Sequence, residues 1–224
     1  MKEILVTDIR KSFPIHHGKA MREVLHGISL RIQPGDRIGI MGPNGAGKST
    51  LINIISGALK PDSGTVQRNM SLSWPLAFGG AFQGALTGRD NTRLIARIYG
   101  KDVKETVEIV EGFAELGPYF DEPVKSYSSG MNSRLGFGLS MAVDFDCFLV
   151  DEVISVGDLR FNRRCEDELR RRENKAMVLV SHHVDLILNN CNSAAYLHEG
   201  RLYSRETVEE TCRAYEELML GSNS

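Results

Sequence analysis

Hydrophobic and polar positions along the chain change period several times, and each period predicts a different element. Residues 4–9 and 25–32 are apolar-leaning runs of the kind that form strands, and residues 13–21 between them are typical of a polar turn region. Residues 37–41 form a short, mostly apolar run that ends at a glycine, as a buried strand does. The start of the chain is therefore expected to consist of short strands and turns.

Helical spacing replaces this pattern after the third predicted strand. Apolar residues between positions 51 and 59 recur at intervals of three and four, which places them on one face of a helix. Residues 91–99, 103–114 and 134–143 predict three further helices. Because these helices lie between stretches that predict strands, we expect an inserted helical subdomain over residues 85–143.

Two later apolar runs end in polar residues. Residues 147–150 are followed by two carboxylates, and residues 176–180 are followed by a serine and a histidine. Strands that alternate with helices indicate a mostly parallel α/β core. We expect a single domain over residues 1–224, with a C-terminal helix at about 206–220 packed on the core.

Composition narrows the class of protein. The 224 residues are 42% hydrophobic and 25% charged, which is typical of a globular domain. Lys and Arg total 27 against 29 Asp and Glu, so the formal net charge is -2 and no global basic field exists to hold nucleic acid. The interleaved charges of residues 160–175 favour a solvated, salt-bridged helix over a nucleic-acid patch. We therefore expect no nucleic-acid partner.

Cysteine usage and hydropathy bear on compartment and membrane association. The four cysteines are scattered, without a CxxC pair, which favours a reduced cytosolic protein that has no cysteine-based metal site. No run approaches the roughly 18 apolar residues that a membrane-spanning helix needs. Any role at a membrane is therefore expected to come through a partner.

A glycine-rich stretch between a predicted strand and a predicted helix supplies the strongest motif. It fits the pattern G-x-x-x-x-G-K-[ST]. Its glycines keep side chains away, so backbone N–H groups can surround a triphosphate, and the helix start adds partial positive charge. The lysine can reach the β- and γ-phosphates, and the first hydroxyl can ligate Mg²⁺. The predicted phosphate-binding residues are Gly42, Pro43, Asn44, Gly45, Ala46, Gly47, Lys48, Ser49 and Thr50.

Asp151 and Glu152 follow one of the later apolar runs. Taken alone, such a pair is more often a solvated strand end. Downstream of a phosphate loop it favours a catalytic site, in which Asp151 and Ser49 hold Mg²⁺ and Glu152 is the general base for a water in line with the γ-phosphate. His182 is a candidate to contact the γ-phosphate or to orient that water, the alternative being an ordinary polar strand end. His183 beside it is expected to be exposed and uninvolved.

Five motifs follow one another along the chain: the phosphate loop, Tyr127-Ser128-Ser129-Gly130-Met131, Val150-Asp151-Glu152, Ser155-Val156-Gly157-Asp158 and Ser181-His182. Their order resembles that of ABC-transporter ATP-binding subunits over nearly the whole chain. Within it, residues 73–78, 82–88, 127–131 and 136–140 look like the subunits of bacterial capsular-polysaccharide exporters. The resemblance implies an α/β fold, with a P-loop NTPase core, a mostly parallel sheet, an N-terminal antiparallel β part and an inserted helical subdomain.

The resemblance also implies a nucleotide site divided between two chains of a homodimer. Ser128, Ser129 and Gly130 correspond to the family's signature, which binds the γ-phosphate held by the opposite subunit. Phe13 falls where the family places an aromatic that stacks on adenine, the alternative being a core phenylalanine at a strand end. Asp158 ends the segment that resembles the family's inter-subunit contact loop. ATP and Mg²⁺ are the expected cofactors.

Two departures from the family pattern concern ATP turnover and the coupling of the nucleotide site to the transporter. Ser129 and Met131 replace the Gly and Gln that are usual in the signature, and both substitutions look shared with the capsule-export subgroup. The family's glutamine that joins Mg²⁺ to the transporter contact has no clear position. Counting places it at Phe78 or Gly79, and Gln83 lies nearby as a further candidate for the metal site.

The resemblance implies an ATPase subunit of an exporter that moves capsular polysaccharide across the bacterial cytoplasmic membrane. It would lie peripherally on the cytoplasmic face of the inner membrane, bound to an integral membrane permease that handles the polysaccharide. The apolar segment 74–82 is expected either to pack in the core or to accept a short helix of that permease. The alternatives are an O-antigen or teichoic-acid exporter subunit, and a soluble ABC ATPase acting on ribosomes or DNA.

Overall fold

The computed structural model describes residues 2–15, 20–75, 82–151 and 159–221. The chain divides into two compact units, of which the first carries two β-sheets and the second carries helices. The first unit comprises Met1–Leu72, Asp146–Glu152 and Glu173–Ser224, and the second comprises Ser73–Phe145 and Val153–Arg172.

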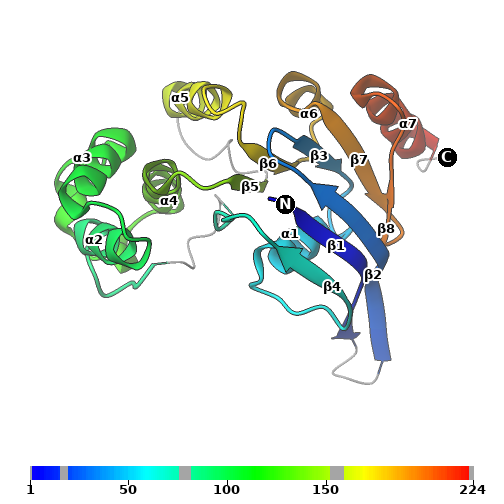
Figure 1. Cartoon of the computed structure of the whole chain (residues 1–224), viewed down its shortest axis with the longest axis horizontal. Coiled ribbons are helices and arrows are strands. Elements are labelled where there is room, and N and C mark those ends of the chain that lie inside the picture. Colours follow the sequence, from blue (N-terminus) through cyan, green and yellow to red (C-terminus); the bar gives the residue numbers. More distant parts are fainter. Residues whose placement is uncertain (1, 16–19, 76–81, 152–158, 222–224) are drawn as a thin grey trace. The chain divides into compact units, whose positions relative to one another are not determined.

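The first unit begins with an antiparallel sheet in the order β2-β1-β4, formed by β1 (Ile4–Ile15), β2 (Ala20–Ile32) and β4 (Ser63–Arg68) (Figure 1). The expectation of a polar turn region at residues 13–21 is wrong at both ends of that range, because the two strands continue into it and pair Phe13 with Arg22; residues 16–19 lie outside the described ranges. The far end of this hairpin is largely exposed. Its residues therefore do not alternate between apolar and polar as those of a half-buried strand do.

Strand β4 is six residues long. It ends at Arg68, whose guanidinium donates to the carbonyls of Ile54 (2.6 Å) and Ile55 (2.7 Å) near the end of α1 (Lys48–Ser56). The last carbonyls of a helix lack intrahelical donors, so Arg68 caps the C-terminal end of α1.

The second sheet has the order β5-β6-β3-β7-β8 and is parallel except for the edge strand β8. Helix α6 lies close to β3 at Gly39. A Cβ at this position would clash with the Ile187 side chain, so the close approach requires glycine. Both helices α6 and α7 pack on this part of the unit (Figure 1). The elements are β3 (Arg37–Met41), β5 (Cys147–Asp151), β6 (Ala176–Val180), β7 (Ser193–His198), β8 (Arg201–Tyr203), α6 (Val184–Asn190) and α7 (Val208–Gly221).

One apolar core joins the two sheets and α1. Its members are the inward-facing residues of β1 and β2, the apolar face of α1 and the almost continuous apolar runs of the parallel strands. Parallel strands covered on both faces are expected to be apolar throughout, as these are. The fully buried members include Ile4, Ile9, Leu25, Ile32, Ile40, Leu51, Ile55, Leu149, Val178 and Leu197.

The second unit contains α2 (Gly88–Ile98), α3 (Val103–Ala114), α4 (Ser129–Val143) and α5 (Leu159–Arg170). Three of these helices begin at side-chain caps. Thr87 accepts from the Asp90 N–H (3.0 Å), Asp102 from the Glu105 N–H (2.8 Å) and Ser128 from the Met131 N–H (3.2 Å). These caps place the starts of α2 and α4 before residues 91 and 134, where apolar spacing alone predicted them.

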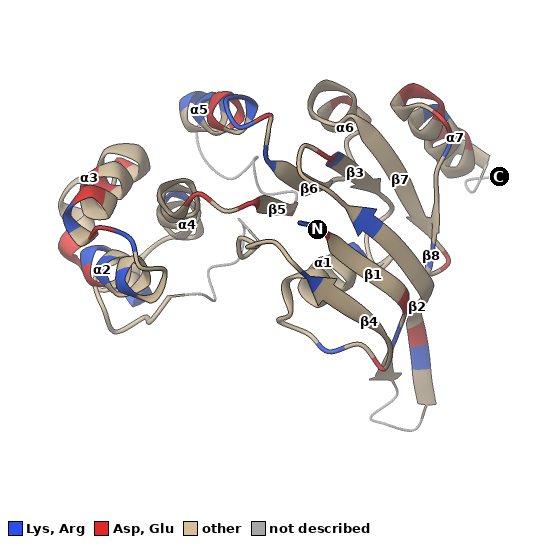
Figure 2. Cartoon of the chain, viewed as in Figure 1, with Lys and Arg blue, Asp and Glu red and all other residues tan. Residues whose placement is uncertain are grey.

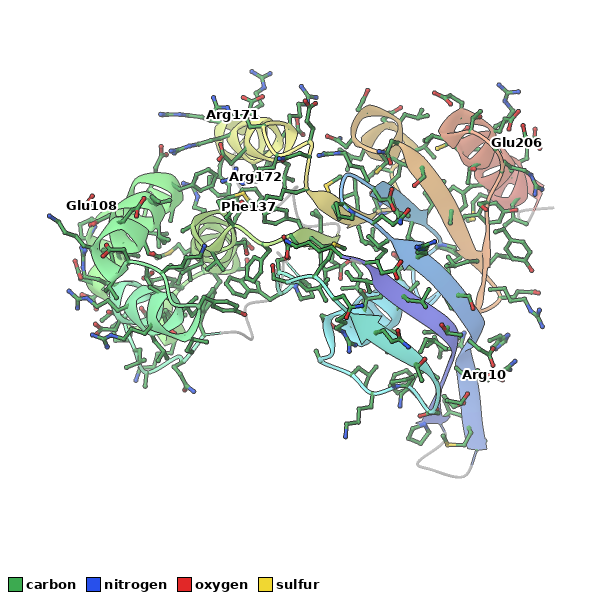
Figure 3. The ribbon with its side chains drawn as sticks, in the orientation of Figure 1. Arg10, Glu108, Phe137, Arg171, Arg172 and Glu206 are labelled. Carbon is green, nitrogen blue, oxygen red and sulfur yellow. The ribbon has the colours of Figure 1, made fainter. Side chains whose placement is uncertain are left out.

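Aromatic packing and ion pairs hold the second unit together. Phe113 and Phe137 stack with their centroids 5.3 Å apart, and the guanidinium of Arg164 lies 4.5 Å from the Phe113 ring. Arg164 also pairs with Glu115 at 2.8 Å, and Arg172 pairs with Glu168. Blue and red residues alternate along α5 in Figure 2, and Figure 3 shows Arg171 and Arg172 near its C-terminal end. The expected salt-bridged helix is confirmed.

The four cysteines are free, and none lies on the fully exposed surface. Burial raises the pKa of Cys147, Cys165 and Cys191 to about 12 and that of Cys212 to about 11. Within the part of the chain that the structure describes, no helix is both long and apolar enough to cross a membrane.

Candidate nucleotide-binding site

The phosphate loop connects β3 to α1, as the sequence predicted. Gly47 is the N-cap of α1 in a left-handed conformation (φ 107°), so it offers no side chain to the first N–H groups of the helix. No acidic residue lies in the first turn. Within the loop, the Ala46 N–H donates to the carbonyl of Pro43 at 3.2 Å and closes a tight turn. The start of α1 therefore lacks a side-chain acceptor, and an anion would complete it.

Gly47 is also required by close packing. A Cβ at this position would lie 2.8 Å from Cγ1 of Val24 on β2, closer than side chains tolerate. By contrast, a Cβ at Gly45 would meet nothing within 4 Å. The loop is thus fixed against β2 at its helix end and unobstructed at its tip.

Lys48 lies at the first position of α1 and is 6% exposed. Its Nζ donates to the carbonyls of Gly42 (2.6 Å) and Pro43 (3.0 Å), so the ammonium lies against the loop. Burial lowers the pKa of Lys48, and the nearby carboxylate of Asp151 opposes that shift. A buried cation at the loop is suited to a phosphate oxygen.

Asp151 ends β5 and lies beside the start of α1. Burial raises the pKa of its carboxyl group, and a hydrogen bond from Ser49 and the charge of Lys48 counteract this rise. A carboxylate and a hydroxyl oxygen in contact are the hard donors that Mg²⁺ prefers. These two side chains therefore fit the metal site predicted from the sequence.

His182 follows β6, and its ring packs against that of His183 with the centroids 3.8 Å apart. Its pKa is lowered by partial desolvation and by the charges of His183 and Lys48. The N–H of His183 donates to Oγ of the buried Ser181 at 2.9 Å, which fixes the backbone at this turn. His183 is exposed, as expected, and its ring contact is with His182.

Phe13 lies in the far part of β1 and is 36% exposed. That exposure contradicts the alternative of a core phenylalanine and leaves a ring face for stacking. Nζ of Lys11 lies 5.6 Å from the ring centroid, and Asp62 holds the same ammonium at 2.7 Å. Asp62 also accepts from the Ser12 N–H at 2.6 Å, so this end of the strand is anchored.

The second unit carries the predicted signature at the start of α4. Ser128 and Ser129 are exposed, and Gly130 follows them in the first turn. Tyr127, immediately before them, is buried and donates its hydroxyl to the carbonyl of Tyr119 at 2.6 Å. Tyr127 therefore anchors the chain immediately before the signature, and the two serines of the signature lie on the surface of the unit.

Gln83 also belongs to the second unit, and it is exposed. Its backbone is held by Asn91, which accepts from the Gln83 N–H at 2.9 Å and donates to the Gln83 carbonyl at 3.1 Å. Asn91 is 1% exposed and was not predicted from the sequence, although a polar residue within a helical apolar pattern is a signal for such a role. Several predicted residues lie outside the described ranges: Phe78 and Gly79 with most of the apolar segment 74–82, Glu152, and the motif Ser155-Val156-Gly157-Asp158.

Comparison with known proteins places this geometry in a family. The sequence profile of the ABC transporter family matches residues 25–155. The chain is 49% identical to the capsule polysaccharide export ATP-binding protein CtrD of Neisseria meningitidis serogroup B, over 96% of this chain and 99% of that protein. It is 42% identical to the polysialic acid transport ATP-binding protein KpsT of Escherichia coli, over 91% and 95% of the two chains. The teichoic acids export ATP-binding protein TagH of Levilactobacillus brevis is 39% identical, over 87% of this chain and 55% of that protein.

The fold agrees with these sequence relationships. A solved structure described as a dimeric post-hydrolysis state of the ATP-binding cassette MJ0796, bound to ADP and Pi, has a TM-score of 0.74 at 22% identity. It covers 92% of this chain, and 98% of that chain is matched. This likeness confirms the expected fold class, an α/β core with an antiparallel N-terminal sheet and added helices. The chain belongs to the ABC transporter family.

Proposed function

We propose that the chain is the ATP-binding and ATP-hydrolysing subunit of an exporter of capsular polysaccharide. The observation that carries the proposal is the gathering of Lys48, Ser49 and Asp151 at a helix start without a side-chain cap. These groups supply the cation, the hydroxyl and the carboxylate that a bound Mg²⁺-triphosphate requires. The high identity to a capsule polysaccharide export ATP-binding protein supports the choice of substrate class.

The reaction is the hydrolysis of ATP to ADP and phosphate. A water oxygen bonds to the γ-phosphorus while the bond from that phosphorus to ADP breaks. Glu152 takes a proton from the water, and His182, kept neutral by its lowered pKa, orients the γ-phosphate or the water. Ser49 and Asp151 would hold Mg²⁺, which offsets phosphate charge when it is bound.

The working unit is a homodimer in which each nucleotide contacts both chains. The phosphate loop of one chain binds ATP, and Ser128, Ser129 and Gly130 of the other chain contact its γ-phosphate. The exposure of both serines at the start of α4 supports this role, because a helix start attracts phosphate. Hydrolysis removes those contacts, so the dimer loosens and moves a membrane partner.

That partner is an integral permease of the inner membrane, which the chain contacts peripherally from the cytoplasmic face. The exposed apolar side chains around α2 supply a contact for it, since Leu94 is 38% and Ile98 67% exposed one helical turn apart. Tyr99 continues this patch and lies 6.4 Å from the ring of Trp74. Apolar side chains left exposed in this way are typical of protein–protein contacts. The permease carries the polysaccharide, and Gln83 near α2 links the contact to the nucleotide.

The second candidate, teichoic-acid export, has weaker support. The TagH relative is 39% identical, against 49% for the capsule export relative. A soluble ABC ATPase acting on ribosomes or DNA is the third, and no described feature favours it over export. The capsule assignment therefore leads, and a cellular experiment tests it.

The decisive experiment is deletion of the gene and complementation with the wild-type chain, Glu152→Gln or Glu206→Gln. Glu152→Gln removes the proposed base, whereas Glu206 is an exposed carboxylate of the first unit and serves as the matched control. We expect capsular polymer to accumulate inside cells that carry the deletion or Glu152→Gln, and to reach the surface in the other two strains. Normal surface display in the deletion strain would refute export.

The purified protein tests the enzymatic part separately. Glu152→Gln should reduce ATP hydrolysis by at least about 10²-fold while ATP binding persists, because the base acts only on the water. The variant should then accumulate as an ATP-bound dimer on size-exclusion chromatography. Unchanged hydrolysis would remove Glu152 from the proposed role, and co-purification with ribosomes instead of membranes would favour the soluble alternative.

A further inference from the structure

A cavity of about 360 Å³ lies beside the phosphate loop in the first unit. Its walls are the tip of the loop, residues of β2 and the turn that joins β7 to β8. The volume is within the range of small-molecule sites. The lining includes Arg22, Glu23, Val24 and His26 from β2, Pro43, Asn44, Gly45 and Ala46 from the loop, and the turn Leu197, His198, Glu199 and Gly200.

Strand register aligns the cavity with the predicted base-stacking residue. Val24 and Leu25 both lie against Gly47, so this part of β2 borders the phosphate loop. The register of β2 against β1 shifts at Val24, and Arg22 and Val24 both line the cavity beside the tip of the loop. Arg22 is in turn the cross-strand partner of Phe13, and directly opposed residues lie about 5 Å apart at Cβ. Phe13, Arg22 and the cavity therefore follow one another in a row that leads to the phosphate loop.

The charged residues around this row differ in whether they already have partners, and this difference points to Arg22. The Glu23 carboxylate pairs with Arg10 at 3.3 Å, and the Glu23 carbonyl contacts His26 Nε2 at 3.2 Å. Arg10, labelled in Figure 3 on the hairpin, also lies 3.8 Å from Asp8. Arg22 is exposed and makes no ion pair or hydrogen bond with any residue that the structure describes. Its guanidinium is the cation of this group that a ligand can recruit.

We propose that Arg22 is an additional nucleotide-binding residue, whose guanidinium contacts the base that stacks on Phe13. This inference rests on the proposed function, since it assumes that the phosphate loop holds a nucleoside triphosphate. A guanidinium is planar, stacks on π faces and donates hydrogen bonds without accepting any. It finds two acceptors on guanine, N7 and O6, whereas adenine offers N7 beside an amino donor. Arg22 therefore makes the site accept GTP as well as ATP.

The test measures dissociation constants of the full-length chain for ATP, ADP, AMP and GTP by titration calorimetry. Arg22→Met keeps the apolar stem and removes the guanidinium, and Arg22→Lys keeps the charge without the planar donors. Arg31→Met is the matched control, because Arg31 lies on the same strand but does not line the cavity. Thermal unfolding of each variant, compared with the wild-type chain, shows that it is folded.

We expect Arg22→Met to weaken the binding of ATP, ADP and AMP by a similar factor, roughly tenfold, because a hydrogen bond from a charged donor is lost. The binding of GTP should weaken by more. The affinities of Arg22→Lys should lie between those of Arg22→Met and the wild-type chain. Arg31→Met should bind each nucleotide as the wild-type chain does. Equal affinities for Arg22→Met and wild type would overturn the inference, and so would a loss that grows with the number of phosphates. If the wild-type chain binds none of the four nucleotides, the proposed function fails, and this inference fails with it.

Discussion

The starts of α1 and α4 are the two helix termini that were predicted to contact phosphate. They differ in how the first N–H groups of the helix are capped. At α1 the cap is Gly47, which has no side chain, and the buried Lys48 lies beside it. At α4 the cap is Ser128, whose hydroxyl already accepts the Met131 N–H at 3.2 Å. The first terminus lacks a side-chain acceptor, whereas the second has one of its own.

This difference indicates why one chain would hold nucleotide without completing the reaction. The α1 terminus gains both a charge partner and acceptors from a phosphate, so it should bind strongly by itself. The α4 terminus gains less, since its serine cap already satisfies an N–H. A weak second contact would suit the proposed homodimer, in which the two chains separate after each turnover.

The largest expected effect comes from the glycines of the first terminus. Gly47→Ala places a Cβ 2.8 Å from Val24 at φ 107°, so we expect the nucleotide-free protein to lose about 3 kcal/mol of stability. Gly45→Ala at φ 79° meets nothing within 4 Å and should lose only about 1 kcal/mol, the cost of the left-handed conformation. Urea denaturation measures both. Equal losses would mean that packing against β2 does not fix the loop.

A smaller effect is expected at the second terminus. Ser128→Ala removes the cap of α4 and should cost about 1 kcal/mol, whereas Ser128→Gly should cost only a few tenths. Hydrogen exchange of the Met131 amide should accelerate, and ATP affinity of the isolated chain should stay unchanged. Ser133→Ala is the control, because that hydroxyl bonds the Ser129 carbonyl at 3.1 Å within the helix and caps nothing. A fall in single-chain ATP affinity would contradict the division of roles between the termini.

The smallest effect concerns the pH dependence of hydrolysis. Desolvation lowers the pKa of His182, and the neighbouring His183 and Lys48 lower it further; Asp185 and Glu216 line the adjoining cavity. His183→Gln removes the contribution of His183 and raises the pKa of His182. The acidic limb of the kcat profile should therefore move to higher pH, and His182→Gln should abolish that limb. A shift to lower pH, or none, would show that the ring contact does not tune His182.

The buried parts of the fold were the most predictable from sequence. Strands β3 and β6 and helix α3 coincide with the residues expected, because continuous or regularly spaced apolar side chains record burial directly. The far end of the β1–β2 hairpin was missed, since its exposed residues are held by backbone pairing that leaves no apolar pattern. Helix starts were missed for a related reason: Thr87 and Ser128 begin helices through single polar caps.

The candidate site also contains parts that the sequence predicts and parts that it does not. The phosphate loop follows from residue types at fixed spacing, and the structure brings Ser49 and Asp151 together as expected. The contact of His183 with His182 and the pairing of Phe13 with Arg22 depend on how the chain folds, so no local pattern contains them. Residue identity thus predicts the parts of a site, and strand register decides which neighbours tune them.

The protected thiols of this chain have a practical consequence. Burial raises the pKa of the native thiols to about 11 or 12, so they carry very little thiolate at neutral pH. A maleimide probe would therefore discriminate sharply in favour of an engineered surface cysteine, without prior removal of the natural ones. Spin labels or cross-linkers placed beside the signature could then report directly on assembly and separation of the paired subunits.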